Sequence, residues 1–265
     1  MLTILSLGAG VQSSTIALMA ARGEIEGTVD ACIFADTGAE PTHIYDYLDF
    51  LEKELPFPIY RVSKGNLRDD VVNASERSRV ATPPFFTGSA GDHGMLRRQC
   101  TREYKVEPIT KKVRELAGLK PRQRTKDIIA QQWIGISWDE ALRMKPSRQW
   151  YIEHRWPLIE KEMRRSDCLN WMERHGYPLP KKSACTFCPY HDDAAWREMK
   201  RDDPESWQDA VSVDRAVRDG IRGTKEKLYV HRFLKPLDEV DFSTLEDLGQ
   251  GNLFIDQCEE GMCGV

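Results

Sequence analysis

The feature that most constrains this chain is an alternation of apolar and amphipathic segments near its start. Residues 2–7, 28–38 and 57–63 are short and apolar, as buried strands are. Residues 13–22 lie between the first two, and in residues 42–55 the apolar side chains recur at helical spacing. Strands that alternate with helices are typical of βαβ units, so the sequence predicts a parallel sheet.

Further along the chain the pattern continues and then changes. Residues 128–137 predict another strand, whereas the Pro- and Gly-rich residues 74–99 predict a long loop. From residue 156 onward the chain becomes rich in proline, cysteine and charge, with a helical stretch over residues 194–220. We therefore expect an α/β domain at residues 1–155 and a cysteine-containing helical region at 156–265.

The composition is that of an ordinary globular protein, with 40% hydrophobic and 30% charged residues. No apolar run approaches the roughly 18 residues that a membrane-spanning helix needs. The first residues lack the basic and apolar regions of a signal peptide. These features lead us to expect a cytoplasmic protein that does not interact with membranes.

A basic segment stands out in a chain whose formal net charge is −4. Residues 97–126 contain eleven Lys or Arg residues, three Glu residues and no Asp. The apolar spacing there predicts a helix that begins near Glu107, with Pro108 in its first turn. Such a segment either faces phosphate groups or forms a solvated helix face.

The segment SLGAGVQSST, residues 6–15, is a candidate phosphate-binding loop. Gly8 and Gly10 would expose backbone N–H groups at a helix N-terminus, and Ser13 and Ser14 would add hydroxyl donors. The lysine of a Walker A loop is absent, and Ser13 stands where a dinucleotide-binding fingerprint has its third glycine. The alternative interpretation is a tight strand–helix turn with serine as the N-cap.

Two polar groups follow predicted strands: Asp36, Thr37 and Gly38 after one strand, and Ser137, Asp139, Glu140 and Arg143 after another. Because ligands bind at the carboxyl edge of open α/β sheets, both groups are candidates for ligand contacts. An acid at such a position can hold a ribose or a metal. The alternatives are a helix N-cap at Asp36 and a helix start with a salt bridge at Asp139 and Arg143.

The chain has seven cysteines, an odd number that does not suit a disulfide framework. Cys185 and Cys188 form a CxxC pair, which favours zinc, an iron–sulfur cluster or a dithiol pair. The cysteines that could add ligands are Cys100, Cys258 and Cys263. We interpret Cys32 and Cys168 as core thiols, and His191 as a surface or second-shell residue rather than a metal ligand.

Five motifs, in order, give the chain a resemblance to a known family over about residues 3–200: GAGVQS, FADTGAEPTHIYDYLDFL, CTREYKVEP, WPLIE and SACTFCPYH. They resemble motifs of the phosphoadenylyl-sulfate reductase family, within the PP-loop ATP pyrophosphatase (adenine nucleotide α-hydrolase-like) superfamily. Gln12 stands where that superfamily's loop has an aspartate. Cys100 stands where the iron–sulfur members have two cysteines in tandem.

The resemblance implies a Rossmann-like, HUP-type parallel sheet with helices on both faces. It implies an adenine nucleotide, ATP or an adenylylated relative, held by Ser6, Gly8, Gly10, Gln12, Ser13, Ser14, Asp36, Thr37 and Gly38. It also implies a [4Fe–4S] cluster held by Cys100, Cys185, Cys188 and Cys263. The catalytic candidates are Cys258, Arg143 and Asp139, and a Mg²⁺ requirement is left open.

Three functions follow from these features. The leading hypothesis is an iron–sulfur enzyme that activates an acceptor with the nucleotide and transfers sulfur to it. The alternatives are a reductase that releases sulfite from adenylyl sulfate or its 3′-phosphorylated form, and a non-catalytic, zinc-stapled nucleic-acid-binding module supported by the basic segment, Trp133 and Trp138. Expected partners are a cysteine desulfurase as sulfur donor or a thioredoxin-like reductant; a nucleic-acid substrate and a homodimer are left open.

Overall fold

The computed structural model describes residues 1–74, 80–89, 92–224 and 226–243. The chain divides into two compact units, here called unit 1 and unit 2. Unit 1 comprises Met1–Gly65 and Arg102–Ser183, and unit 2 comprises Asn66–Thr101 and the described residues from Ala184 onward. Each unit is therefore built from two separate stretches of chain.

Unit 1 contains a five-stranded parallel sheet in the order β3-β2-β1-β6-β7. Its strands are β1 (Leu2–Ser6), β2 (Ala31–Asp36), β3 (Ile59–Ser63), β6 (Ala130–Trp133) and β7 (Ile152–Arg155). The chain runs outward from β1 through β2 to β3 and then returns to the other side of β1. Every pairing is parallel, as the alternation of apolar and amphipathic segments predicts.

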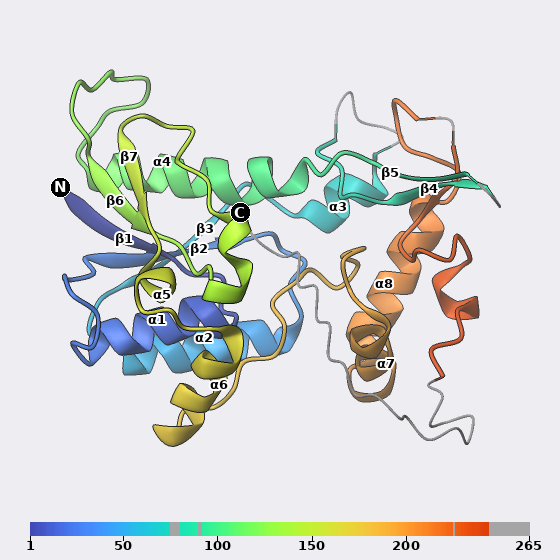
Figure 1. Ribbon diagram of the computed structural model, residues 1–265. Helices are drawn as coiled ribbons and strands as arrows, with labels where there is room; N and C mark the ends of the chain where they lie inside the picture. Colours follow the sequence, from blue (N-terminus) through green and yellow to red (C-terminus); the bar gives the residue numbers. More distant parts are fainter. Residues whose placement is uncertain (75–79, 90–91, 225, 244–265) are drawn as a thin grey trace. The chain divides into compact units, whose positions relative to one another are not determined.

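Helices cover both faces of this sheet (Figure 1). One face packs against α1 (Val11–Ala21), α2 (Thr42–Glu54) and α6 (Arg165–Arg174), and the other packs against α4 (Glu107–Leu116). Successive side chains of a strand point to opposite faces. Leu5 of β1 accordingly joins the core under α1, whereas Ile4 packs with Val113 of α4. The predicted Rossmann-like sheet with helices on both faces is confirmed.

Unit 2 combines helices with a three-stranded antiparallel sheet in the order β5-β4-β8. Its elements are α3 (Leu67–Val72), β4 (Phe86–Ser89), β5 (Asp92–Met95), α7 (Asp193–Asp202), α8 (Pro204–Val217) and β8 (Leu228–Tyr229). The helical stretch predicted at residues 194–220 is broken at Asp203, which lies between α7 and α8. Pro204 has no N–H group and begins α8, while the Asp203 side chain accepts the Ser206 N–H at 3.1 Å.

The hairpin of β4 and β5 lies within residues 74–99, where the sequence predicts a loop. Gly94 pairs with Thr87 across the hairpin, and a Cβ atom at residue 94 would lie 2.7 Å from Thr87 Oγ1. The loop prediction was wrong for these strands because this glycine accommodates a cross-strand side chain rather than ending a strand.

Two other sequence predictions concern the chain as a whole. The units follow packing in space, whereas the predicted domains 1–155 and 156–265 follow a change of composition, and that domain division stays a prediction. Among the described residues, no helix combines the length and apolar character that crossing a membrane requires.

Asp214 of α8 is a fully buried carboxylate that joins three segments of unit 2. It accepts the Val230 N–H at 2.9 Å and the Leu237 N–H at 3.0 Å, and it forms an ion pair with Arg218. Burial raises the pKa of Asp214, and its donors act in the opposite direction. The carboxylate therefore fixes the chain after β8 and the short 3-10 helix η3 (Leu237–Glu239) onto α8.

Replacing Asp214 by alanine should lower the free energy of unfolding by about 3–5 kcal/mol, because a buried cation and two N–H groups lose their acceptor. Urea unfolding followed by tryptophan fluorescence measures this loss. Asp238→Ala is the control, since Asp238 pairs with a largely exposed Arg215 and such pairs contribute about 1 kcal/mol or less. Equal losses in the two variants would contradict a special role for Asp214.

Candidate functional site

The strand order of unit 1 places a topological switch point between β1 and β6. The chain leaves β1 toward β2 and leaves β6 toward β7, so the connections after these neighbouring strands diverge. In open α/β sheets, ligands bind at the carboxyl ends of the strands at such a point. Here the two strands are followed by residues 7–10 and by residues 134–137.

The loop after β1 turns directly into α1. Ala9 has a φ of 55°, in the left-handed region, and Gly10 is the N-cap, with no side-chain hydrogen bond that caps the helix. The Ser13 hydroxyl accepts the Gly8 N–H at 3.1 Å and donates to the Gly10 carbonyl at 3.3 Å. The first turn of α1 thus leaves its positive dipole end open to an anion.

Gly135 follows β6 and touches the first turn of α1. A Cβ atom at residue 135 would lie 2.8 Å from the Ser13 backbone N and 3.0 Å from the Ser13 Cα. Those atoms are backbone, so a larger residue would have to displace α1 itself. Sequence reasoning missed this role, although a glycine directly after a predicted strand is a signal of close backbone approach.

Three buried serines lie at or near the ends of these strands. Ser6 Oγ accepts an N–H of the Gln132 side chain at 2.5 Å, which ties β1 to β6. Ser14 Oγ makes no hydrogen bond in the described structure, and Ser14 lies beside Tyr47, whose pKa burial raises. Ser137 Oγ is also buried without a hydrogen bond to a described residue. Because an unsatisfied buried hydroxyl costs about 1–3 kcal/mol, Ser137 is a position where a ligand or water would be stabilised.

Gln12, in the first turn of α1, contacts the short helix η2 (Trp138–Arg143) that follows β6. Its Nε2 donates to Glu140 Oε2 at 3.3 Å, and Glu140 forms an ion pair with Arg143. Burial raises the pKa of Glu140, and Arg143 lowers it. The structure therefore brings the predicted residues Gln12 and Arg143 together through a carboxylate, Glu140, that was not among the predicted catalytic residues.

Asp139, the neighbour of Glu140, makes a different contact. Its Oδ1 accepts the backbone N–H of Arg165 at 3.1 Å, and Arg165 is the first residue of α6. A carboxylate at a helix N-terminus stabilises that helix. The described contact is therefore structural, and the catalytic role of Asp139 stays a prediction.

The Asp-Thr-Gly segment after β2 forms a tight turn. Asp36 Oδ1 accepts the Gly38 N–H at 2.7 Å and the Tyr45 hydroxyl at 2.9 Å, and Gly38 has a φ of 67°. The Thr37 hydroxyl donates to Glu40 Oε1 at 3.2 Å. These bonds hold the carboxylate of Asp36 at the edge where β1 and β2 also end.

The basic segment is divided by the fold. Lys105 Nζ lies 3.4 Å from Glu40 Oε1, close to the turn after β2. Residues 117–129, by contrast, lead from α4 to the start of β6, where Ala130 pairs with Leu2. Residues 120–126 therefore lie at the amino edge of the sheet, away from the switch point. Whether the basic segment faces phosphate groups or forms a solvated face stays a prediction.

Cys185 and Cys188 of unit 2 form a compact turn. The Cys185 carbonyl accepts the Cys188 N–H at 3.0 Å and the His191 Nε2–H at 2.9 Å. His191 is buried, and its ring lies edge-on to Trp196 with centroids 4.7 Å apart. The imidazole thus positions the turn through its backbone. His191 is buried rather than at the surface, and its position behind metal ligands stays a prediction.

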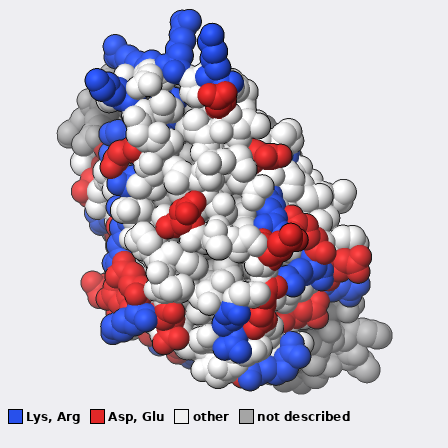
Figure 2. Space-filling model, turned by 90° about the vertical axis from the view of Figure 1, so that its left-hand side faces the viewer, with Lys and Arg blue, Asp and Glu red and all other residues white. Residues whose placement is uncertain are grey.

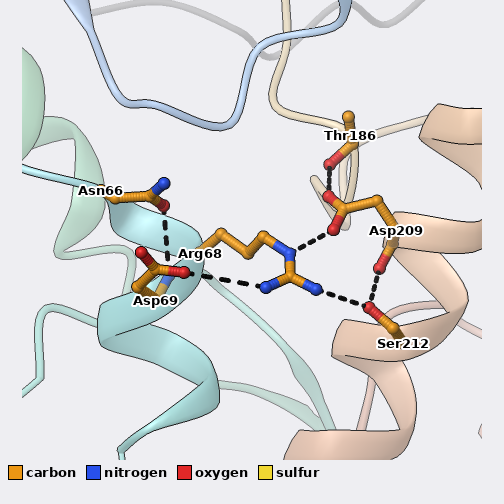
Figure 3. A network of polar contacts seen from close by, with 6 residues as sticks. All are labelled: Asn66, Arg68, Asp69, Thr186, Asp209 and Ser212. Carbon is orange, nitrogen blue, oxygen red and sulfur yellow. Dashed lines mark hydrogen bonds and ion pairs between the residues drawn. The ribbon is translucent and has the colours of Figure 1, made fainter.

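A polar network holds the same turn through Thr186 (Figure 3). The Thr186 hydroxyl donates to Asp209 Oδ2 at 2.6 Å, and Asp209 forms an ion pair with Arg68 of α3. Arg68 also donates to the Ser212 hydroxyl at 3.0 Å. The turn that carries both cysteines is therefore anchored to α8 and, through Arg68, to α3.

The other cysteines divide into two groups. Cys32 and Cys168 are fully buried; burial raises the pKa of both thiols, to about 12 for Cys168, as expected for inert core residues. Cys258 and Cys263 lie outside the described residues. Within the described part of the chain, no three His, Cys, Asp or Glu side chains form a group that could hold a metal ion. Cys100, Cys185 and Cys188 therefore form no such group there, and the predicted cluster stays a prediction.

Comparison with solved structures found several chains of similar shape. One of them is a phosphoadenylyl-sulfate (PAPS) reductase from Candida auris in a phosphate complex, with 14% identity and a TM-score of 0.45. The match covers 69% of this chain and 80% of that chain. No protein-family model and no curated protein matches the sequence. The fold assignment accordingly rests on the strand order and helix layers of unit 1.

Gly135→Ala should destabilise unit 1 by about 1–3 kcal/mol, because its Cβ would overlap the Ser13 backbone. Gly8→Ala is the matched control, since a Cβ there would meet only Ser13 Oγ, at 3.7 Å. Urea unfolding of both variants gives the comparison. If Gly135→Ala were as stable as Gly8→Ala, the close approach would not be a constraint.

Thr186→Val should lower stability by about 1–2 kcal/mol, because Asp209 loses one hydrogen-bond donor. It should also speed the labelling of Cys185 and Cys188 by a thiol reagent, followed by peptide mass spectrometry. Thr186→Ser keeps the hydroxyl and should behave like the unmodified protein. Unchanged labelling in Thr186→Val would show that the network does not hold the turn.

Proposed function

We propose that this chain is an enzyme that binds ATP or an adenylylated nucleotide at the N-terminus of α1 and transfers sulfur to an activated acceptor. The observation that carries the nucleotide part is the contact of Gly135 with Ser13 at the switch point. It brings the residues after β6 against a helix end that lacks a side-chain cap. That arrangement suits a phosphate group.

The surrounding residues supply the remaining contacts in this proposal. Backbone N–H groups of the first turn of α1 bind phosphate oxygens, and the Ser13 hydroxyl joins them by turning from the Gly10 carbonyl to the phosphate. The Asp36 carboxylate accepts from a ribose hydroxyl. Arg143, held by Glu140, contacts the α-phosphate of bound ATP and also neutralises the negative charge that develops there during the reaction. Gln12 orients Glu140 and thereby the guanidinium.

The reaction has two displacements. An acceptor oxygen first bonds to the α-phosphorus of ATP, while the bond to the bridging oxygen breaks and pyrophosphate leaves. A sulfur nucleophile then bonds to the acceptor carbon, while the carbon–oxygen bond breaks and AMP leaves. With sulfur supplied at the oxidation level of sulfide, neither step needs an oxidant or a reductant.

The sulfur-handling part is supported by the sequence resemblance and by the ordered turn of Cys185 and Cys188. Cys258 as a catalytic thiol, and a [4Fe–4S] cluster held by Cys100, Cys185, Cys188 and Cys263, belong to the same proposal. No step of the reaction is assigned to the cluster. A partner that supplies sulfide-level sulfur, such as a cysteine desulfurase with its reductant, completes the proposal.

Arg143→Ala should weaken ATP binding by about 10- to 100-fold, because it removes a charge-assisted contact worth roughly 1.5–3 kcal/mol. Isothermal titration calorimetry with ATP measures the dissociation constant, and an assay for pyrophosphate measures turnover with an acceptor. Arg143→Lys should recover part of the affinity. Arg174→Ala, at an exposed arginine on α6, is the control and should bind ATP normally.

Failure of the unmodified protein to bind ATP, or equal binding by Arg143→Ala, would overturn the nucleotide assignment. Release of sulfite from an adenylyl sulfate, without pyrophosphate release from ATP, would instead identify the reductase alternative. Iron and sulfide analysis of anaerobically purified protein tests the cluster separately. Zinc in place of iron, with no nucleotide turnover, would favour the non-catalytic module.

A further inference from the structure

The amino edge of the unit 1 sheet carries a surface that the proposed reaction does not use. We call it the amino-edge surface: Lys120, Arg122, Arg124, Lys126, Arg148 and Trp150. The four residues from 120 to 126 precede β6, and the other two precede β7. All six side chains are exposed.

Paired strands and ring contacts hold these two segments next to each other. β6 and β7 are paired so that Ala130 lies opposite Ile152. Just before them, the Ile129 N–H donates to the Tyr151 carbonyl at 2.9 Å. The Arg114 guanidinium lies over the Tyr151 ring, 5.2 Å from its centroid, and also donates to the Gln123 carbonyl. The loop 117–129, the end of α4 and the start of β7 therefore form one continuous surface.

The charge of this surface is positive, because residues 117–129 carry four Lys or Arg and one acid, Asp127. None of Lys120, Arg122, Arg124, Lys126 and Arg148 forms an ion pair with a described residue. Figure 2 shows Lys and Arg side chains projecting at the top of this face, where Figure 1 places the loop between α4 and β6. Because the whole chain is acidic, with a net charge of −4, this concentration is local. Unpaired, exposed cations gathered in this way attract a polyanion.

An aromatic side chain accompanies the cations. Trp150 is 60% exposed, and Ile128, which would face it if the β6–β7 register continued, is 47% exposed. Trp133, which the sequence suggested as a nucleic-acid contact, is fully buried and donates to the Gln131 side chain, so it cannot stack on a base. The Trp150 ring, by contrast, lies edge-on to Tyr151 and leaves most of its surface exposed. Aromatic rings among cations are how proteins bind unpaired bases.

We propose that the amino-edge surface binds a single-stranded nucleic acid, with phosphates on the four cations of the 120–126 loop and on Arg148 and with one base stacked on Trp150. A single strand fits better than a duplex because only an unpaired base offers its face to the ring. The surface is separate from the switch point, so strand binding does not depend on the nucleotide proposal.

Fluorescence anisotropy with a labelled oligothymidylate of about 20 nucleotides tests this at several salt concentrations. The variant K120A/R122A/R124A/K126A should lose at least about tenfold in affinity and lower the slope of log K against log salt by about 3, at roughly 0.7 per lost phosphate contact. Trp150→Ala should lose about 5- to 100-fold with little change of slope, while Trp150→Phe keeps most of the affinity.

The control variant K53A/K161A/K227A/K235A removes the same charge from exposed positions elsewhere and should bind like the unmodified protein. Equal loss in this control, or no loss in the loop variant, would overturn the proposal. If polyglutamate or anionic lipid vesicles bound as tightly as the oligothymidylate, the proposal would also be overturned, and another class of partner would be identified. The loop variant should unfold at the same temperature and bind ATP like the unmodified protein, which separates failure of this site from failure of the nucleotide site.

Discussion

A residue without a side chain lets two distant parts of unit 1 touch: Gly135, after β6, lies against the backbone of Ser13 in α1. The other cross-links of the candidate site surround this contact. Ser6 accepts from Gln132 on the strands just before it, and Gln12 donates to Glu140 just beyond it. A bulkier residue at 135 would separate both pairs. The close approach of the segments after β1 and β6 thus depends mainly on backbone packing, and the two hydrogen bonds add to it.

The sheet and its core could be predicted because their signals are local. Buried strands are short apolar runs, and the helices repeat apolar residues at helical spacing. Each strand or helix of unit 1 can therefore be recognised from about ten consecutive residues. The core thiols Cys32 and Cys168 followed from the same periodicity. The location of the candidate site also followed, because the carboxyl edge of a parallel sheet is fixed by strand direction.

What could not be predicted depends on partners far away in sequence. The pairing of Gln12 with Glu140 joins residues 128 positions apart, and no local pattern records it. Thr186 sits inside the CxxC motif, yet its role is set by Asp209 and Arg68 from two other helices. The basic segment is continuous in sequence, yet within unit 1 it reaches two edges of the sheet: Lys105 lies beside the turn after β2, whereas residues 120–126 lie before β6.

β6 is short, so the amino edge of the sheet lies close to the switch point at its carboxyl edge. The strand has four residues, so it spans about 13 Å from the amino edge to the switch point. Stacked nucleotides of one strand advance by about 3.4 Å each. A strand anchored on Trp150 would therefore need only about four more nucleotides to cover that distance. The length of β6 would thus set how many nucleotides separate the base on Trp150 from the one that reaches the switch point.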